Sequence, residues 1–150
     1  MRQRPRLAAG FTLLEVIAVL VIGAIMYALM LGVPGRGTSS ADLKASARSL
    51  ASGLRTAQTT AMATRRDALL TVDLESHEFE VPGITQPQKL PQKVDLQLYT
   101  AESEIQSEKR GSIRFYPDGS STGGRITVSS GERKYLVDVD WLTGRVSIEE

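Results

Sequence analysis

The chain has 150 residues, no cysteine, a single histidine and a formal net charge of +1. This length suits one domain of ordinary size with an anchoring segment, and the lack of cysteine excludes both a disulfide framework and a thiolate metal site. Residues 1–66 contain nine Lys or Arg against two acids, whereas residues 67–150 contain nine against fifteen, and this acidic half argues against nucleic-acid binding, which needs clustered positive charge.

The N-terminal part is a short basic segment, residues 1–10, followed by a long apolar run from Phe11 to Val33 whose one charge is Glu15. As a helix this run would be about 35 Å long, and the hydrocarbon core of a bilayer is about 30 Å thick. A secretory signal peptide would have a shorter apolar stretch, followed by the small residues of its cleavage site. Here the small residues end at Gly10, before the apolar run begins. We expect a transmembrane helix over 11–33, and an uncut signal anchor is the alternative interpretation.

Residues 34–66 are predicted to contain a linker and an amphipathic helix. Pro34, Gly35 and Gly37 interrupt the helical pattern, either as a domain linker or as a stretch that extends in an assembly. A helix is then expected to run to about Thr64. Its apolar stripe has helical spacing and consists of Leu43, Ala47, Leu50, Leu54, Ala57 and Ala61.

Residues 67–150 alternate with a period of two, which predicts antiparallel strands with one buried face. Pro117-Asp118-Gly119 and Thr143-Gly144 are among the turn signals between them. Two polar stretches, Pro82–Lys93 and Thr100–Gly111, are expected to be loops. The fold class is therefore α+β, with a long N-terminal helix followed by an antiparallel β-sheet or β-sandwich head.

The head offers few groups for chemistry. His77 is expected on a surface turn, and Asp138 and Asp140 on a solvated strand face with no further metal ligands in view. Gly119–Gly124 lacks the Lys of a phosphate loop and is interpreted as a hairpin turn, and Trp141 is expected in the core with the strand before it. We therefore expect no enzyme, no metal site and no cofactor.

The stretch Gly10-Phe11-Thr12-Leu13-Leu14-Glu15-Val16 resembles the class III signal of type IV pilins and type II secretion pseudopilins. The resemblance implies that residues 1–10 are a leader, that a prepilin peptidase cuts between Gly10 and Phe11, and that it methylates the new amino group of Phe11. Glu15 is then the fifth residue of the mature chain. It is either tolerated near the membrane interface or paired with the Phe11 amine, where it would help to set the register between subunits.

Two C-terminal segments point to one family among these pilin-like proteins. Residues 112–124, which include Tyr-Pro-Asp-Gly, and residues 139–146, which include Asp-Trp-Leu-Thr-Gly, are similar to the minor pseudopilin H family. This implies a pilin-like structural subunit near the tip of the type II secretion pseudopilus, which supports export across the outer membrane. The implied partners are the peptidase, the major pseudopilin G and the minor pseudopilins I, J and K. The implied location is a single pass through the bacterial inner membrane, with residues 67–150 as a periplasmic head.

Two other functions stay open from the sequence. A FimT-type minor pilin that binds DNA for uptake would share the N-terminus, but the acidic head and the missing cysteines favour the pseudopilin and no nucleic-acid partner. A membrane-anchored domain without a filament role is the remaining alternative.

Overall fold

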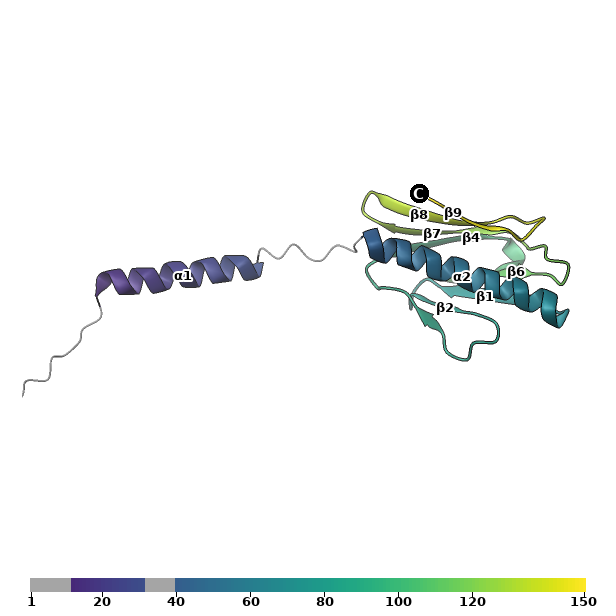
Figure 1. Ribbon diagram of the computed structural model, residues 1–150, viewed down its shortest axis with the longest axis horizontal. Coiled ribbons are helices and arrows are strands. Elements are labelled where there is room, and N and C mark those ends of the chain that lie inside the picture. The colour runs from purple at the N-terminus through teal and green to yellow at the C-terminus, as the bar shows by residue number, and fades with distance from the viewer. Residues whose placement is uncertain (1–11, 32–39) are drawn as a thin grey trace, which may run out of the picture. The chain divides into compact units, whose positions relative to one another are not determined.

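The computed structural model of the chain describes residues 12–31, of which 28–31 by their backbone alone, and residues 40–150. The chain divides into two compact units, Met1–Arg36 and Gly37–Glu150. In the described residues, the first unit contains one helix, and the second contains a helix and two antiparallel sheets (Figure 1). The finer division into segments 1–10, 11–33, 34–66 and 67–150 stays a prediction.

Helix α1 spans Leu13–Leu31 within the predicted apolar run. It begins after Thr12, whose side-chain oxygen accepts a hydrogen bond from the backbone N–H of Glu15 at 3.3 Å. Thr12 thus acts as the N-cap residue and satisfies one of the free donors of the first turn. Pro34, Gly35 and Gly37, predicted to break the helix, lie outside the described residues.

Helix α2 spans Ser40–Thr64 and buries one face. The predicted stripe is confirmed, because every position named for it is fully buried: Leu43, Ala47, Leu50, Leu54, Ala57 and Ala61. Gly53 shares this face, and a Cβ atom there would come within 2.9 Å of both Leu70 and Phe79. The helix therefore packs against the first strands at a distance that a larger residue would increase.

The strands form two sheets in which all pairings are antiparallel. The strand order is β3-β2-β1-β6-β5 in the five-stranded sheet and β4-β7-β8-β9 in the four-stranded sheet. The strands are β1 (Ala68–Asp73), β2 (Glu78–Glu80), β3 (Gln88–Lys89), β4 (Asp95–Thr100), β5 (Ile105–Ser107), β6 (Arg110–Phe115), β7 (Gly124–Ser130), β8 (Arg133–Val139) and β9 (Val146–Glu149), with a 3-10 helix, η1 (Glu102–Glu104), before β5.

Helix α2 lies across both sheets, as Figure 1 shows, with β7, β8 and β9 on one side and β1 and β6 on the other. The core lies beneath it, because the buried side chains of both sheets face the α2 stripe. Leu70 pairs in register with Ile113 in one sheet, and Ile126 pairs with Val137 in the other, and all four are fully buried. The sheets are also joined between β4, an edge strand, and β6, where the Thr100 hydroxyl donates to the Ser112 carbonyl at 2.7 Å.

The expectation that two polar stretches are loops was wrong in part. Strand β3 lies within 82–93, and η1, β5 and the start of β6 lie within 100–111. These elements are short and mostly exposed, so they lack the run of apolar alternation that identifies a strand in a sequence. Pairing with β2 and β6 makes them strands, and that information is not local.

The Gly119–Gly124 run contains a turn but does not join two neighbouring strands. A local bridge pairs Phe115 with Ser121, and the chain then crosses from β6 in one sheet to β7 in the other. The interpretation as a turn is thus confirmed, whereas the hairpin between adjacent strands is wrong. Hairpin signals describe local geometry, and they do not say which sheet receives the next strand.

The prediction that Trp141 is in the core was wrong, because its exposed fraction is 66%. Strand β8 ends at Val139, and the backbone N–H of Gly144 donates to the Asp140 carbonyl at 2.8 Å in the turn that follows. The alternation that buries Tyr135, Val137 and Val139 therefore stops before it reaches Trp141.

Candidate functional site

The predicted processing residues Gly10 and Phe11 lie outside the described residues. Glu15 lies in the first turn of α1, where a carboxylate interacts favourably with the positive end of the helix dipole. With Thr12 it forms the Thr-x-x-Glu pattern of a capping box, of which the structure shows the bond from the Glu15 N–H to Thr12. The bond shown uses the Glu15 backbone, so Thr12 is the residue whose side chain caps the helix, and the role of the Glu15 carboxylate stays a prediction.

The described side chains of helix α1 leave no face of it buried. Every described side chain from Thr12 to Tyr27 is exposed, and Leu13 and Leu14 are 81% and 78% exposed. A helix that is apolar on all sides is stable only in an apolar surrounding or among partner helices. No helix in the described ranges meets the combined length and hydropathy criteria for a membrane span.

At the other end of the chain, two turns are tied to α2 by one side chain. The Gln58 amide donates to the Gly119 carbonyl at 2.9 Å and to the Thr143 carbonyl at 3.0 Å. Gly144 is buried between them with a φ of +62°, and a Cβ there would collide with the Gly119 carbonyl and with Gln58. Both segments that resemble the minor pseudopilin H family thus meet on α2.

Carboxylates fix the conformation of three turns. Asp140 accepts hydrogen bonds from the hydroxyl and the backbone N–H of Thr143, and these lower the pKa of its carboxyl. The hydroxyl of Ser120 lowers the pKa of Asp118 in the same way, and the backbone N–H of Ser76 lowers that of Asp73. These bonds are made by the ionised carboxylates, so they require a pH above the pKa of each group.

We therefore expect the urea midpoint of unfolding to be constant above about pH 5 and to fall as the pH drops below about 4. Each of these three groups has a lower pKa in the folded chain than when unfolded, so its contribution is complete above the unfolded pKa and is lost as the pH falls through the folded one. Asp140→Asn should make the decline shallower. If Asp140→Asn left the decline unchanged, Asp140 would not contribute to the pH dependence. The control is Glu132→Gln, which removes a carboxylate from an exposed turn and should not change the decline.

The outer side of the five-stranded sheet carries an ion pair whose carboxylate is buried and whose guanidinium is partly exposed. The Arg114 Nε donates to Glu104 Oε1 at 2.9 Å and its Nη2 donates to Oε2 at 3.3 Å, and the Glu104 side chain is 5% exposed. These bonds raise the pKa of the Arg114 guanidinium. Asp67 adds a contact at 3.3 Å, so Arg114 joins η1 to the start of β1.

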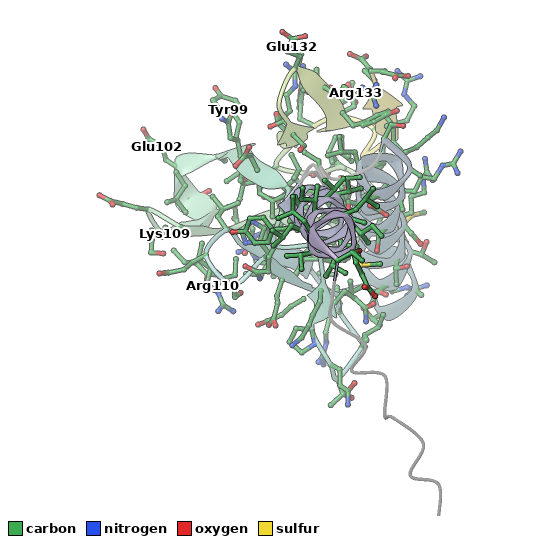
Figure 2. All side chains as sticks on the ribbon, turned by 90° about the vertical axis from the view of Figure 1, so that its left-hand side faces the viewer. Tyr99, Glu102, Lys109, Arg110, Glu132 and Arg133 are labelled. Atoms are coloured by element: carbon green, nitrogen blue, oxygen red, sulfur yellow. The ribbon has the colours of Figure 1, made fainter. Side chains whose placement is uncertain are left out.

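The sequence analysis missed an exposed row on the four-stranded sheet. Tyr99, Arg125, Asp138 and Ser147 are direct neighbours in register across its four strands. Tyr99 is 79% exposed, and Figure 2 shows its side chain standing clear of the ribbon. Asp138, expected on a solvated face, is only partly exposed and accepts a hydrogen bond from Arg125 at 2.6 Å. His77 does lie in the turn before β2, and its Nε2 is 2.8 Å from the Val94 carbonyl oxygen.

Known protein families match both the N-terminal segment and the head of the chain. The family model described as type II transport protein GspH matches residues 46–143, and the model described as the prokaryotic N-terminal methylation motif matches residues 5–31. A protein of Xanthomonas campestris pv. campestris named type II secretion system protein H is 31% identical over 138 residues, which cover 91% of this chain and 80% of that protein.

Two solved structures share the fold. The minor pseudopilin EpsH from the type 2 secretion system of Vibrio cholerae has a TM-score of 0.56 at 13% identity and covers 72% of this chain and 96% of its own. The type IV minor pilin FimU of Pseudomonas aeruginosa has a TM-score of 0.55 at 12% identity, and the match covers 75% of this chain and 92% of that one. The predicted pilin-like α+β class is therefore confirmed.

Proposed function

The chain belongs to the type II transport protein GspH family, and on this premise we propose that it is a minor structural subunit of a type II secretion pseudopilus. The observation that carries this proposal is the combination of the family match over 46–143 with an N-terminal methylation motif over 5–31. The exposed apolar side chains described on α1 support it, because such a helix needs neighbours. In this role the subunit lies near the filament tip and supports export across the outer membrane.

The proposed location is the bacterial inner membrane, with the apolar segment 11–33 as the anchor and the head in the periplasm. The proposed partners are a prepilin peptidase, the major pseudopilin G and the minor pseudopilins I, J and K. The test is co-purification of the full chain, in detergent, with tagged candidate pseudopilins. Stable association with the I–J pair is expected, and no association with any pseudopilin would contradict the proposal.

Processing at Gly10 is the first step of the proposed role. Mass spectrometry of the chain extracted from membranes of cells that contain a prepilin peptidase should show a mature protein that begins with N-methylated Phe11. Gly10→Val should leave the leader attached, because a β-branched side chain would replace the small residue before the cut. The matched control is Ala8→Val. A mature protein that still began with Met1 in the unaltered chain would rule out this processing.

After the cut, we propose that Glu15 pairs with the amino group of Phe11 on its own or a neighbouring chain. A carboxylate near the centre of a bilayer costs about 2.5–3.5 kcal/mol on insertion scales, and pairing with a cation in a medium of low dielectric offsets that cost. The ion pair would also set the axial register between packed helices.

Glu15→Val is therefore expected to leave cleavage largely intact and to impair incorporation into the filament, measured as the amount of chain that co-purifies with sheared pseudopili. Thr12→Val is the control for the local role, because it removes the capping oxygen and keeps the carboxylate. If Thr12→Val reduced incorporation as strongly as Glu15→Val, helix capping rather than pairing would explain the effect.

A further inference from the structure

Helix α2 and the two residues after it carry a strong excess of positive charge. Residues 40–66 contain five Lys or Arg and one acid, whereas residues 67–150 contain nine and fifteen. Because the apolar stripe of α2 is buried against the sheets, the basic side chains lie on the part of the helix that faces away from the core. All of them are exposed: Lys44, Arg48, Arg55, Arg65 and Arg66.

Three of these residues lie along one line on the helix surface. Lys44, Arg48 and Arg55 are separated by four and then seven positions, and this spacing keeps them within about 40° of one another around the axis. The line is about 16 Å long, at a rise of about 1.5 Å per residue. We call these three residues the basic ridge, and its length suits contact with several side chains of a folded partner.

The carboxylates of the head do not form salt bridges with the basic ridge. Among the described residues, every salt bridge joins two groups within residues 67–150. Arg55 donates to the Val146 carbonyl at 3.2 Å, and that acceptor is neutral. The sheets thus pair many of their own charges, whereas the positive charge of the ridge is left for a group from outside the head.

One carboxylate lies near the ridge and limits which anion fits. The Tyr135 hydroxyl donates to the Glu150 carboxylate at 3.1 Å. Burial raises the pKa of Tyr135 and the charge of Arg48 acts in the opposite direction, so Arg48 and Glu150 both lie close to this hydroxyl. A polyanion such as a nucleic acid would meet Glu150 together with Arg48. The carboxylates of a folded protein surface can each be placed opposite one cation.

The chain itself shows that a head of this fold can present the complementary charge. Asp95, Glu102 and Glu108 are exposed and form no salt bridge among the described residues. Figure 2 shows Glu102 on the side of the head away from α2. In a helical filament each subunit contacts the next through two different surfaces, so a basic surface on one subunit can meet an acidic surface on its neighbour.

We propose that the basic ridge binds an acidic surface of a neighbouring filament subunit, with carboxylates opposite Lys44 and Arg48. The inference rests on the proposed function for the identity of the neighbour. The chain between Leu31 and Ser40 can span no more than about 32 Å. An α1 helix packed among those of other subunits would therefore keep the ridge within reach of their heads.

Other protein surfaces fit less well. A basic surface would be repelled by all three residues of the ridge, and like charges placed opposite each other exclude a partner. An apolar surface would cover Lys44 and Arg48 without offering an acceptor, and burial of a charge without a partner is unfavourable. The ridge thus selects the neighbour by charge and orients it, more than it adds to affinity.

The contact is tested in cells by a photo-crosslinking amino acid at position 52, because Ser52 is exposed between Arg48 and Arg55. An adduct with another pilin-like subunit is expected, and mass spectrometry should place the attachment next to Asp or Glu. Lys44→Glu/Arg48→Glu should lower the yield of this adduct at least about tenfold, because repulsion replaces attraction. Arg55 is left unchanged because it also bonds the Val146 carbonyl.

The matched control is Lys109→Glu/Lys134→Glu, which makes the same change in net charge at exposed residues outside α2. It should leave the yield within about twofold. Both double variants should keep the urea midpoint of the unaltered chain, which shows that they fold. Replacement of the neighbour's acid beside the attachment site by Lys should restore the adduct with Lys44→Glu/Arg48→Glu.

Equal loss of the adduct in the two double variants would overturn the proposal, because net charge rather than the ridge would then be responsible. An attachment far from any acid would also overturn it, as would an adduct with phospholipid or nucleic acid in place of a subunit. If the chain co-purifies with pseudopilins but position 52 gives no adduct, this inference fails and the proposed function stands. If the chain does not co-purify either, both fail.

Discussion

Gly144→Ala is expected to lower the free energy of unfolding by about 2–5 kcal/mol, one of the two largest effects that we predict for the head. Gly144 has a φ of +62°, a left-handed conformation that costs an L-residue about 1–2 kcal/mol. The added methyl group would also collide with the Gly119 carbonyl and with the Gln58 amide, and overpacking of this kind costs about 1–3 kcal/mol. Urea unfolding of the detergent-solubilised chain, followed by far-UV circular dichroism, measures the change.

Gly131→Ala is the matched control for Gly144→Ala. Gly131 also has a φ of +62°, but a Cβ there would meet nothing within 4 Å. Its replacement should cost only the backbone term, about 1–2 kcal/mol. Similar losses in the two variants would show that the close approach of the two turns at Gln58 does not limit stability.

Arg114→Met is expected to cost about 3–5 kcal/mol, because it leaves the Glu104 carboxylate buried without its partner. The double variant Arg114→Met/Glu104→Met should recover most of the loss, because the pair is then replaced by apolar side chains of similar length. The same urea unfolding experiment measures both variants.

Lys109→Met provides the comparison for an exposed pair. Lys109 and Glu75 are 3.3 Å apart, and their side chains are 61% and 72% exposed, so the change should cost no more than about 1 kcal/mol. If Arg114→Met cost as little as Lys109→Met, the burial of Glu104 would not have the energetic consequence assigned to it.

The parts of the fold that depend on local periodicity could be predicted from the sequence. The stripe from Leu43 to Ala61 follows from helical spacing alone, and the structure buries every member of it. The same is true of the alternation in β8, where Tyr135, Val137 and Val139 are buried. In each case the pattern is repeated often enough within one element to specify its buried face.

The parts that depend on partners far away in the chain could not be predicted. Strand β3 is defined by two residues that pair with β2, and the crossing from β6 to β7 depends on which sheet receives the chain. A local signal for the exposure of Trp141 is present in the sequence, because Asp140 and Gly144 are typical turn residues and a turn over 140–144 ends the alternation before Trp141.

The candidate site residues also differ in whether the local sequence indicates them. Glu15 was found through a motif and lies in the first turn of α1, as a helical reading of the apolar run requires. Tyr99 and Asp138 are 39 positions apart in the numbering and are brought into one row only by the pairing of β4, β7 and β8. Nothing in the sequence near either residue indicates the other, so the row could be recognised only from the sheet register.

The position of α2 across both sheets also determines the order in which the head can form during synthesis. The strands β7, β8 and β9 pair as consecutive hairpins, so that sheet closes through short loops, whereas β1 must wait for β6 while β2 to β5 are made. The helix precedes every strand in the chain, and its apolar face has no cover until the strands arrive. A nascent head therefore leaves part of that face uncovered until β9 is made, and apolar surface exposed in this way is prone to aggregation.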